Sequence, residues 1–180
     1  MIFVMPRSFI TFLETLSHRD YSFPAGKMIV DIDDEVTQLF TISSGLVHLI
    51  RYQADGAAVV LQRAGKGAIL SEASVFFTRY HCAAVAIQPS ELRAYPLKTV
   101  RALMESTPQA AQAFAKYLAN EVRSARKRAE ILALKTVSER LSAWLIWNGG
   151  AMPERGTWHH VADELSVSRE ALYRELSKRR

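Results

Sequence analysis

Side chains that can hydrogen-bond to nucleic-acid bases recur at helical spacing near the C-terminal end of the sequence. They are Glu170, Tyr173, Arg174 and Ser177, with Arg169 at their N-terminal edge. Because an α-helix repeats every 3.6 residues, these side chains fall on one face. Arginine can pair bidentately with guanine, and glutamate can accept a hydrogen bond from cytosine N4. The spacing therefore predicts a helix that presents a polar face to the major groove of DNA.

The residues around this face predict two short helices joined by a tight turn. Thr157 can cap the first helix and Ser168 the second. Ser168 and Lys178, at the two ends of the second helix, complete the expected set of DNA contacts. Apolar residues at three- and four-residue steps give the two helices a common core: Val161, Ala162, Leu165, Leu172 and Leu176. This is the pattern of a helix-turn-helix, and equally of an ordinary amphipathic helix pair with a solvated charged face.

The distribution of charge separates these two interpretations. The chain carries a formal net charge of +5, from 23 Lys and Arg against 18 Asp and Glu. Residues 116–180 hold 13 basic and 8 acidic residues, which accounts for the whole excess. The basic residues are interleaved with a helical apolar pattern and not gathered into a polybasic tail, which argues against contact with acidic lipid. Double-stranded DNA is therefore the predicted partner of the C-terminal region.

The size and composition of the chain limit its class. A chain of 180 residues has room for one ordinary core and a small appendage, which predicts two unequal domains. A hydrophobic content of 49% is typical of a folded protein, and no apolar run approaches the roughly 20 residues that cross a bilayer. The first residues lack the pattern of a signal peptide, and the single cysteine, Cys82, excludes an intrachain disulfide. We therefore expect a cytoplasmic location and no membrane contact.

Short β-rich runs, broken by turn signals about every ten residues, occupy the chain from Tyr21 to about Leu97. This spacing predicts a small β-barrel or roll. The clearest hairpin is expected at Asp55-Gly56, a pair typical of two-residue turns. The predicted strands are Met28–Ile32, Leu39–Ser43, Leu46–Tyr52, Ala58–Arg63, Ala83–Ala86 and Glu91–Pro96.

A long helix is expected after the β-rich region. Thr107-Pro108 provides its N-cap and first-turn proline, and its pattern runs to about Leu134. The narrow apolar stripe of this helix predicts packing against the same helix of a second subunit, and the alternative is packing on the β-rich region. A further helix over Val137–Trp147, followed by a break at Gly149-Gly150, is expected to brace the helix-turn-helix. The stripe contains Ala111, Phe114, Leu118, Val122, Ala125, Ala129 and Leu132.

The order of β-roll, long helix, bracing helix and helix-turn-helix resembles the Crp/Fnr family of bacterial transcription regulators along nearly the whole chain. The resemblance implies an α+β fold with a cyclic-nucleotide-binding-like β-roll (jelly roll) as effector domain over residues 1–106. A dimerisation helix would follow over 107–134, and a DNA-binding helix-turn-helix domain over 135–180. Four segments carry the resemblance: Phe23-Pro-Ala-Gly26, Phe40-Thr-Ile-Ser-Ser-Gly45, Val137-Ser-Glu-Arg-Leu141, and Ser168-Arg-Glu170 with Arg174.

By this resemblance, Arg169, Glu170 and Arg174 read a half-site like the TGTGA pattern of the cyclic-AMP receptor branch. A two-fold dimer presents two identical helices, so two such half-sites are expected in inverted orientation, about one helical turn apart. The implied partners are double-stranded DNA and a second copy of the chain, with RNA polymerase as a further candidate. An unknown small-molecule effector in the roll would control the dimer.

The pocket that binds cyclic nucleotides in this family departs from its pattern here. Its Gly-Glu-Leu segment corresponds to Ser71-Glu72-Ala73, and the arginine of its Arg-Ser-Ala segment corresponds to His81, followed by Cys82. A neutral imidazole is a poor substitute for the guanidinium that neutralises a buried phosphate. Arg126 occupies a position of the long helix where family members contact the base of the bound nucleotide. We therefore expect an effector other than cyclic AMP, bound by Ser71, Glu72, His81, Cys82 and Arg126.

Three interpretations of this pocket stay open. The first is a different effector that meets Glu72, His81, Cys82 and Tyr80. The second is sensing of metal, haem or redox state by His81 and Cys82, although a mononuclear metal site usually needs three or four ligands. In the third, Cys82 is a small buried apolar residue and His81 is a hydrogen-bonded one. No cysteine cluster supports an iron–sulfur centre, and the sequence identifies no cofactor.

Two other classes of function match the sequence less well. A metal enzyme on such a roll needs several converging histidines, and only His48 and His81 of the five fall in this region, so no catalytic residue or metal ligand is predicted. The other class is a protein-interaction module that has lost DNA binding, because the family's β-hairpin wing is not expected after the second helix. If DNA binding is retained without a wing, Lys178, Arg179 and Arg180 are the candidate phosphate contacts that replace it.

Overall fold

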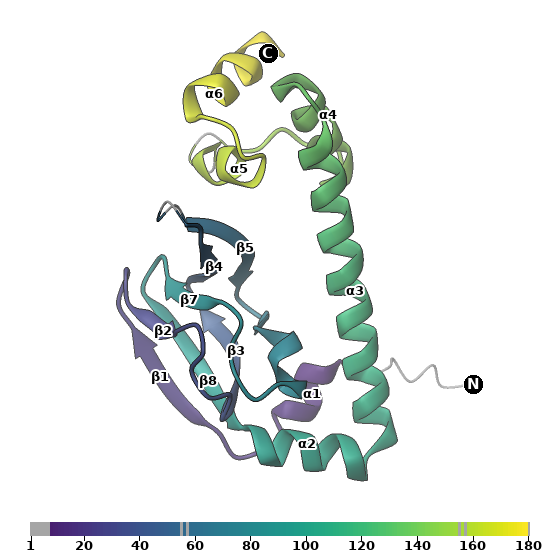
Figure 1. Ribbon diagram of the computed structural model, residues 1–180. Helices are drawn as coiled ribbons and strands as arrows, with labels where there is room; N and C mark the ends of the chain where they lie inside the picture. The colour runs from purple at the N-terminus through teal and green to yellow at the C-terminus, as the bar shows by residue number, and fades with distance from the viewer. Residues whose placement is uncertain (1–7, 55, 57, 155, 157, 180) are drawn as a thin grey trace, which may run out of the picture. The chain divides into compact units, whose positions relative to one another are not determined.

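The computed structural model describes residues 8–54, 56, 58–154, 156 and 158–179 (Figure 1). Packing divides the chain into two compact units, Met1–Leu118 and Ala119–Arg180. Helix α3 (Pro108–Ala133) contributes residues to both units. No helix in the described part of the chain is long and apolar enough to cross a membrane.

Within the described residues, eight strands build the first unit as a roll of two antiparallel sheets (Figure 1). One sheet has the order β1-β8-β3-β6 and the other the order β2-β7-β4-β5. The strands are β1 (Arg19–Phe23), β2 (Met28–Val30), β3 (Gln38–Ser44), β4 (Leu46–Tyr52), β5 (Ala58–Gly65), β6 (Ile69–Leu70), β7 (Ala83–Ala86) and β8 (Ser90–Pro96). The roll that the turn spacing predicts is therefore confirmed.

Strand β3 is buried on both of its faces and joins two layers of the core. Successive side chains of a strand point to opposite faces. Phe40 and Ile42 belong to the cluster between the two sheets, where they meet Leu92 of β8, whereas Leu39 belongs to the cluster beneath the helices. Full burial of an apolar side chain of this size contributes about 1.5–3 kcal/mol. The roll thus has a filled interior and a second apolar layer outside it.

Three short helical segments and the first part of α3 cover this second layer. They are α1 (Phe9–Leu13), the 3-10 helix η1 (Glu72–Phe76) and α2 (Leu97–Ser106). The Ser8 side chain caps α1 by accepting a hydrogen bond from the Thr11 amide. The Phe9 ring packs against Phe114 of α3, with ring centroids 4.6 Å apart. The start of α3 is therefore part of the core of the first unit.

The second unit contains α4 (Val137–Trp147), α5 (Trp158–Glu164) and α6 (Arg169–Lys178). Thr136 and Glu139 form a reciprocal capping box at the start of α4. Gly149 and Gly150 both have φ near +81°, a left-handed backbone that ends the helix. The helices share one apolar core with the end of α3: Ile131, Leu141, Trp158, Val161, Ala162, Leu165, Leu172 and Leu176. The bracing helix and the helix-turn-helix core are therefore confirmed.

Several predicted boundaries hold and others shift by one or two residues. Strands β4 and β7 and helix α4 have the predicted bounds, and α3 begins at Pro108. The prediction that the first strand is Met28–Ile32 is wrong, because Arg19–Phe23 already pairs with β8 from end to end. The β4–β5 hairpin is confirmed, with Gly56 at φ +84°. The predicted cap Thr157, the hairpin residue Asp55 and the phosphate contact Arg180 lie outside the described residues.

Candidate DNA-recognition helix and effector pocket

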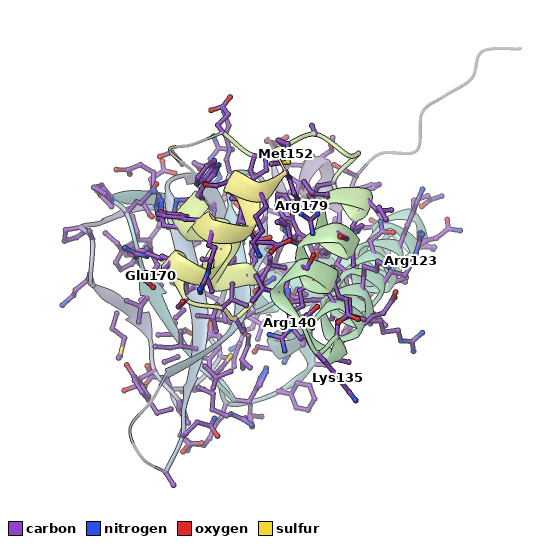
Figure 2. All side chains as sticks on the ribbon, turned by 90° about the horizontal axis from the view of Figure 1, so that it is seen from above. Arg123, Lys135, Arg140, Met152, Glu170 and Arg179 are labelled. Carbon is purple, nitrogen blue, oxygen red and sulfur yellow. The ribbon has the colours of Figure 1, made fainter. Side chains whose placement is uncertain are left out.

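Helix α6 buries one face and leaves the other open. Leu172 and Leu176 are fully buried, at 0% exposure. Figure 2 shows Arg179 between α6 and α4, and Glu170 on the other side of α6. The six residues predicted to contact DNA are all exposed: Ser168, Arg169, Glu170, Tyr173, Arg174 and Lys178. The exposed face of α6 therefore carries the donors and acceptors that base recognition requires.

The first turn of α6 fixes the charge of Glu170. The Ser168 side chain caps the helix by accepting a hydrogen bond from the Ala171 amide at 3.2 Å. Hydrogen bonding to its own backbone amide, and then to Ser168, holds the pKa of Glu170 below its ordinary value. The carboxylate is therefore ionised at neutral pH and can only accept hydrogen bonds. That is the role that a contact with the amino group of cytosine demands.

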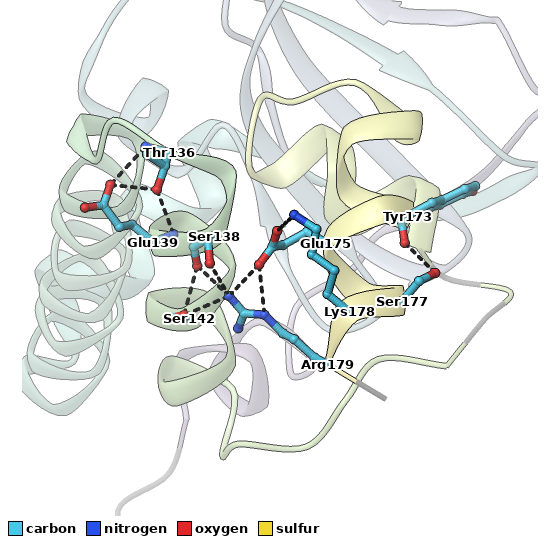
Figure 3. Close-up of polar contacts among 9 residues, drawn as sticks. All are labelled: Thr136, Ser138, Glu139, Ser142, Tyr173, Glu175, Ser177, Lys178 and Arg179. Atoms are coloured by element: carbon cyan, nitrogen blue, oxygen red, sulfur yellow. Dashed lines mark hydrogen bonds and ion pairs between the residues drawn. The ribbon is translucent and has the colours of Figure 1, made fainter.

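Arg179 anchors the end of α6 to α4 (Figure 3). Its Nη2 donates to the Ser138 carbonyl at 2.8 Å, to Ser138 Oγ at 2.9 Å and to Ser142 Oγ at 3.0 Å. The same guanidinium lies 3.3 Å from Glu175 Oε1, and its side chain is 23% exposed. The Nε and Nη2 donors of Arg179 are thus used to position the helix, and a phosphate contact by this residue stays a prediction. Lys178 keeps 66% of its side chain exposed and stays a candidate phosphate contact.

Polar bonds also fix α5 and the turn before α6. Arg140 of α4 donates to the Leu165 carbonyl at 3.0 Å, and Trp144 Nε1 donates to Glu164 Oε2 at 2.6 Å. The Trp158 ring lies 5.3 Å from the ring of Tyr173, between centroids. These contacts tie all three helices together, so α6 is held as a rigid element.

In the first unit, Ser71 and Glu72 lie at the start of η1. Ser71 is 3% exposed and has φ +53°, a left-handed conformation that is costly outside glycine. Its Oγ lies 2.7 Å from Ser74 Oγ, which fixes the turn. Gln62 of β5 donates from Nε2 to Glu72 Oε2 at 3.1 Å. The Gln62 Oε1 atom is buried and accepts no hydrogen bond from the described residues, so it is an open acceptor beside Glu72.

The side chains of His81 and Cys82 have opposite environments. His81 is exposed, whereas Cys82 is 1% exposed and belongs to the cluster inside the roll. Burial raises the pKa of the Cys82 thiol, and the neighbouring Glu72 carboxylate adds to the rise. Arg51 and a hydrogen bond to Ser71 oppose it. Cys82 is therefore the residue of the pair that shares the environment of Ser71 and Glu72.

Arg51 is a functional candidate that the sequence analysis missed. It lies near the end of β4, and its Nη2 donates to the His81 carbonyl at 2.7 Å. Its charge also acts on the Cys82 thiol. A guanidinium is thus present near Cys82, supplied by a strand and not by the loop that carries His81. Strand-end arginines are common, so only the three-dimensional pairing distinguishes this one.

The structure gives the metal interpretation little support. No three His, Cys, Asp or Glu side chains gather at one point within the described ranges. His81 and Cys82 also face different surroundings, although they are adjacent in the chain. A mononuclear metal site usually needs three or four ligands. This pair supplies only two, one exposed and one buried.

The apolar stripe of α3 divides between two environments. Phe114 is buried and Leu118 is partly buried in the first unit, as the packing alternative predicts. Further along, Val122 is 47% exposed, and Ala125 and Ala129 are exposed. The second half of the stripe is thus an open apolar seam, which we call the α3 seam (Val122, Ala125 and Ala129).

Comparison with known proteins agrees with this architecture. Residues 21–107 match the family model of the cyclic nucleotide-binding domain. A search of curated protein sequences finds no significant match. Among solved structures, FixK2 from Bradyrhizobium japonicum is 20% identical with a TM-score of 0.74, over 91% of this chain and 84% of that chain. CLP of Xanthomonas campestris, described as a c-di-GMP responsive global regulator, is 19% identical with a TM-score of 0.68, over 94% and 89%.

The catabolite activator protein of Thermus thermophilus is 25% identical with a TM-score of 0.56, over 98% of this chain and 84% of that chain. The chain therefore combines a cyclic nucleotide-binding domain with the fold of the Crp/Fnr transcription regulators. This confirms the resemblance recognised in the sequence. The Crp/Fnr class is one of regulators and not of enzymes, in agreement with the sequence-based expectation.

Proposed function

We propose that this protein is a cytoplasmic, homodimeric transcription regulator of the Crp/Fnr type that reads an inverted repeat in double-stranded DNA. The observation that carries the proposal is the two-sided character of α6. Its apolar side is fully buried at Leu172 and Leu176, and its opposite side exposes Arg169, Glu170 and Arg174. A helix of this kind in a helix-turn-helix enters the major groove and contacts base edges.

The exposed side chains define a half-site chemistry. Arg169 and Arg174 would pair with guanine O6 and N7, and the ionised Glu170 would accept from cytosine N4. These contacts suit a TGTGA-like half-site, in which the complementary strand supplies the cytosines. Ser168 and Tyr173 flank the contacts, and Lys178 would bind phosphate. Each good base contact contributes about 1–3 kcal/mol of discrimination.

The α3 seam supports the homodimer. Val122, Ala125 and Ala129 recur at three- and four-residue steps, and small side chains allow two helices to approach closely. An apolar stripe left open to water is costly, and pairing with the same stripe of a second copy removes it from water. Two-fold pairing would give two copies of α6 and hence an inverted repeat.

The effector would be a small molecule other than cyclic AMP, bound in the roll. The proposed pocket combines the Glu72 carboxylate, the buried amide oxygen of Gln62 and the Cys82 thiol, with Arg51 at its edge. Such a set fits a ligand that carries hydrogen-bond donors together with an anionic group. His81 is exposed and would contribute through its backbone carbonyl, which orients Arg51.

Fluorescence anisotropy tests the DNA-binding part of the proposal. The probe is a duplex with two TGTGA half-sites in inverted orientation, compared with a shuffled duplex at the same salt concentration. Arg169→Ala and Arg174→Ala should each lose about 1–3 kcal/mol for the inverted repeat and little for the shuffled duplex. Lys98→Ala, an exposed cation of α2, is the matched control for charge. Equal affinity of the wild-type protein for both duplexes would refute the proposal.

A further inference from the structure

The second unit contains a groove of about 530 Å³ that the proposed function does not use. It lies between α3 and the end of α4, and Arg123, Arg126, Lys127, Glu130 and Trp147 line it. Figure 2 shows Arg123 extending outward from α3. Pockets for small ligands usually measure about 300–1,000 Å³. The groove therefore has the size of a small-molecule site.

The charge of the groove favours an anion. Three of its side chains are cationic and one is a carboxylate. Lys127 Nζ and Glu130 Oε1 are 2.8 Å apart, so this pair is satisfied within the groove. Arg123 and Arg126 make no ion pair with any described residue. Two guanidinium groups are thus left to bind an incoming anion, which they can hold through paired hydrogen bonds.

Trp147 gives the groove a flat apolar wall. It is the last residue of α4 and is 41% exposed. The other two tryptophans are committed elsewhere, because Trp144 donates to Glu164 and Trp158 donates to the Pro153 carbonyl. An exposed indole beside guanidinium groups is suited to stack against a flat ring whose charged substituent the arginines bind.

The groove borders the α3 seam and lies mostly on another side of the helix. The 3.6-residue period places Arg123 and Lys127 on a different side of α3 from Val122, Ala125 and Ala129. Arg126 lies beside Val122 by the same period, so pairing of two α3 helices along the seam would leave Arg123 and Lys127 open and place Arg126 at the border of the seam. The groove is also distinct from α6, whose residues do not line it.

We infer that this groove binds a small anion that carries a flat aromatic ring, with Trp147 stacking on the ring and Arg123 and Arg126 binding the anionic group. A nucleoside monophosphate and an aromatic carboxylate share this chemistry. Arg126 thereby acquires a role in the second unit, separate from the role in the roll pocket that the family resemblance implies. The inference does not depend on the DNA-binding proposal.

Tryptophan fluorescence and equilibrium dialysis of the full chain test the inference, with AMP and salicylate as separate probes. We expect saturable quenching by at least one probe, and weaker binding of adenosine or inorganic phosphate alone. Arg123→Ala and Arg126→Ala should each weaken binding about tenfold, and Trp147→Ala should weaken it by at least about fivefold. AMP and salicylate separate phosphate from carboxylate as the preferred anion.

Lys98→Ala removes an exposed cation from the first unit and should leave the dialysis curve unchanged. Circular dichroism of each variant shows whether the helices are retained. Absence of binding of both probes to the wild-type protein would overturn the inference. It would equally be overturned if Arg123→Ala and Arg126→Ala bound both probes like wild type while weakening duplex DNA, because the arginines would then be phosphate contacts.

Discussion

The phenolic oxygen of Tyr117 accepts a hydrogen bond from the backbone amide of Ile69 at 3.0 Å. Ile69 belongs to β6, which lies at the edge of its sheet. Alternate residues of an antiparallel strand direct their amides away from the neighbouring strand, and Tyr117 of α3 satisfies this one. Two residues further along, Ser71 begins the turn into η1, which carries the proposed effector site. This bond therefore connects the segment that leads into η1 to the long helix.

Tyr117→Phe should destabilise the first unit by about 1–2 kcal/mol, because the buried Ile69 amide loses its acceptor. Urea unfolding followed by circular dichroism measures this. Tyr52→Phe is the matched control, since Tyr52 is 48% exposed and its change should cost less than about 0.5 kcal/mol. Equal midpoints for the two variants would contradict the structural role assigned to Tyr117.

Gly45→Ala should be strongly destabilising. Gly45 has φ +92°, and an added Cβ would lie 2.5 Å from the Pro89 carbonyl oxygen and 2.6 Å from Ser90 Cα. Backbone strain and overpacking together should cost about 3 kcal/mol or more. Gly67→Ala provides the control, because Gly67 has φ +82° and nothing within 4 Å of the added carbon. Its cost should stay near 1 kcal/mol, and a similar loss for both variants would show that the close approach to β8 is unimportant.

Arg179→Ala should destabilise the second unit by about 1–2 kcal/mol, because Ser138, Ser142 and Glu175 all lose a donor. Lys178→Ala, next to it, removes one exposed ion pair at 3.4 Å and should cost less than about 0.5 kcal/mol. Thermal unfolding monitored by tryptophan fluorescence compares them. At moderate salt we expect Lys178→Ala to weaken DNA binding more than Arg179→Ala does, since Lys178 is the candidate phosphate contact.

Tyr80→Phe should change the alkaline part of the stability profile. Burial, with contributions from Asp34 and Cys82, raises the pKa of Tyr80 to about 12 from 10.0. Above pH 10 the Tyr80 phenol therefore loses its proton in the unfolded chain and keeps it in the folded chain. The stability that protonated Tyr80 contributes is complete below pH 10 and is lost between pH 10 and 12. The phenol also donates to the Gln38 carbonyl at 3.0 Å. At pH 8 the free energy of unfolding of the wild-type protein should exceed that of Tyr80→Phe by about 1 kcal/mol.

The difference between wild type and Tyr80→Phe should shrink as the pH rises through this window. Free energies of unfolding in urea from pH 8 to 12 give the difference directly, and other titrating groups affect both proteins alike. A difference that stays constant to pH 12 would mean that Tyr80 has an ordinary pKa in the folded protein.

Periodic patterns were sufficient to predict α3, α4, the two helices of the helix-turn-helix and the central strands. Helix α4 has the predicted bounds because its apolar spacing and the Thr136 capping box agree. Strand β1 was missed because its alternation consists of Tyr21 and Phe23 alone, which is too short to identify a strand. Its pairing with β8 is what makes it a strand, and pairing between distant segments leaves no local signal.

The proposed effector site was harder to predict than the proposed recognition helix. The face of α6 follows from the helical period alone, so its exposed residues could be named from the sequence. Which of His81 and Cys82 faces inward depends on how the loop enters β7, where Ala83 and Ala84 are buried. Arg51 and Gln62 reach the pocket from strands that are remote in the sequence, and only the folded chain brings them to Cys82 and Glu72.

The most direct test of the central claim is selection of bound duplexes from a random-sequence DNA library by the purified protein, repeated with Arg169→Ala. Its mass in solution, measured by light scattering, should be that of a dimer, and Val122→Glu should lower it. We expect recovery of an inverted repeat with TGTGA-like halves, absent with Arg169→Ala. Recovery of no motif at low salt, or of the same motif by wild type and Arg169→Ala, would contradict it.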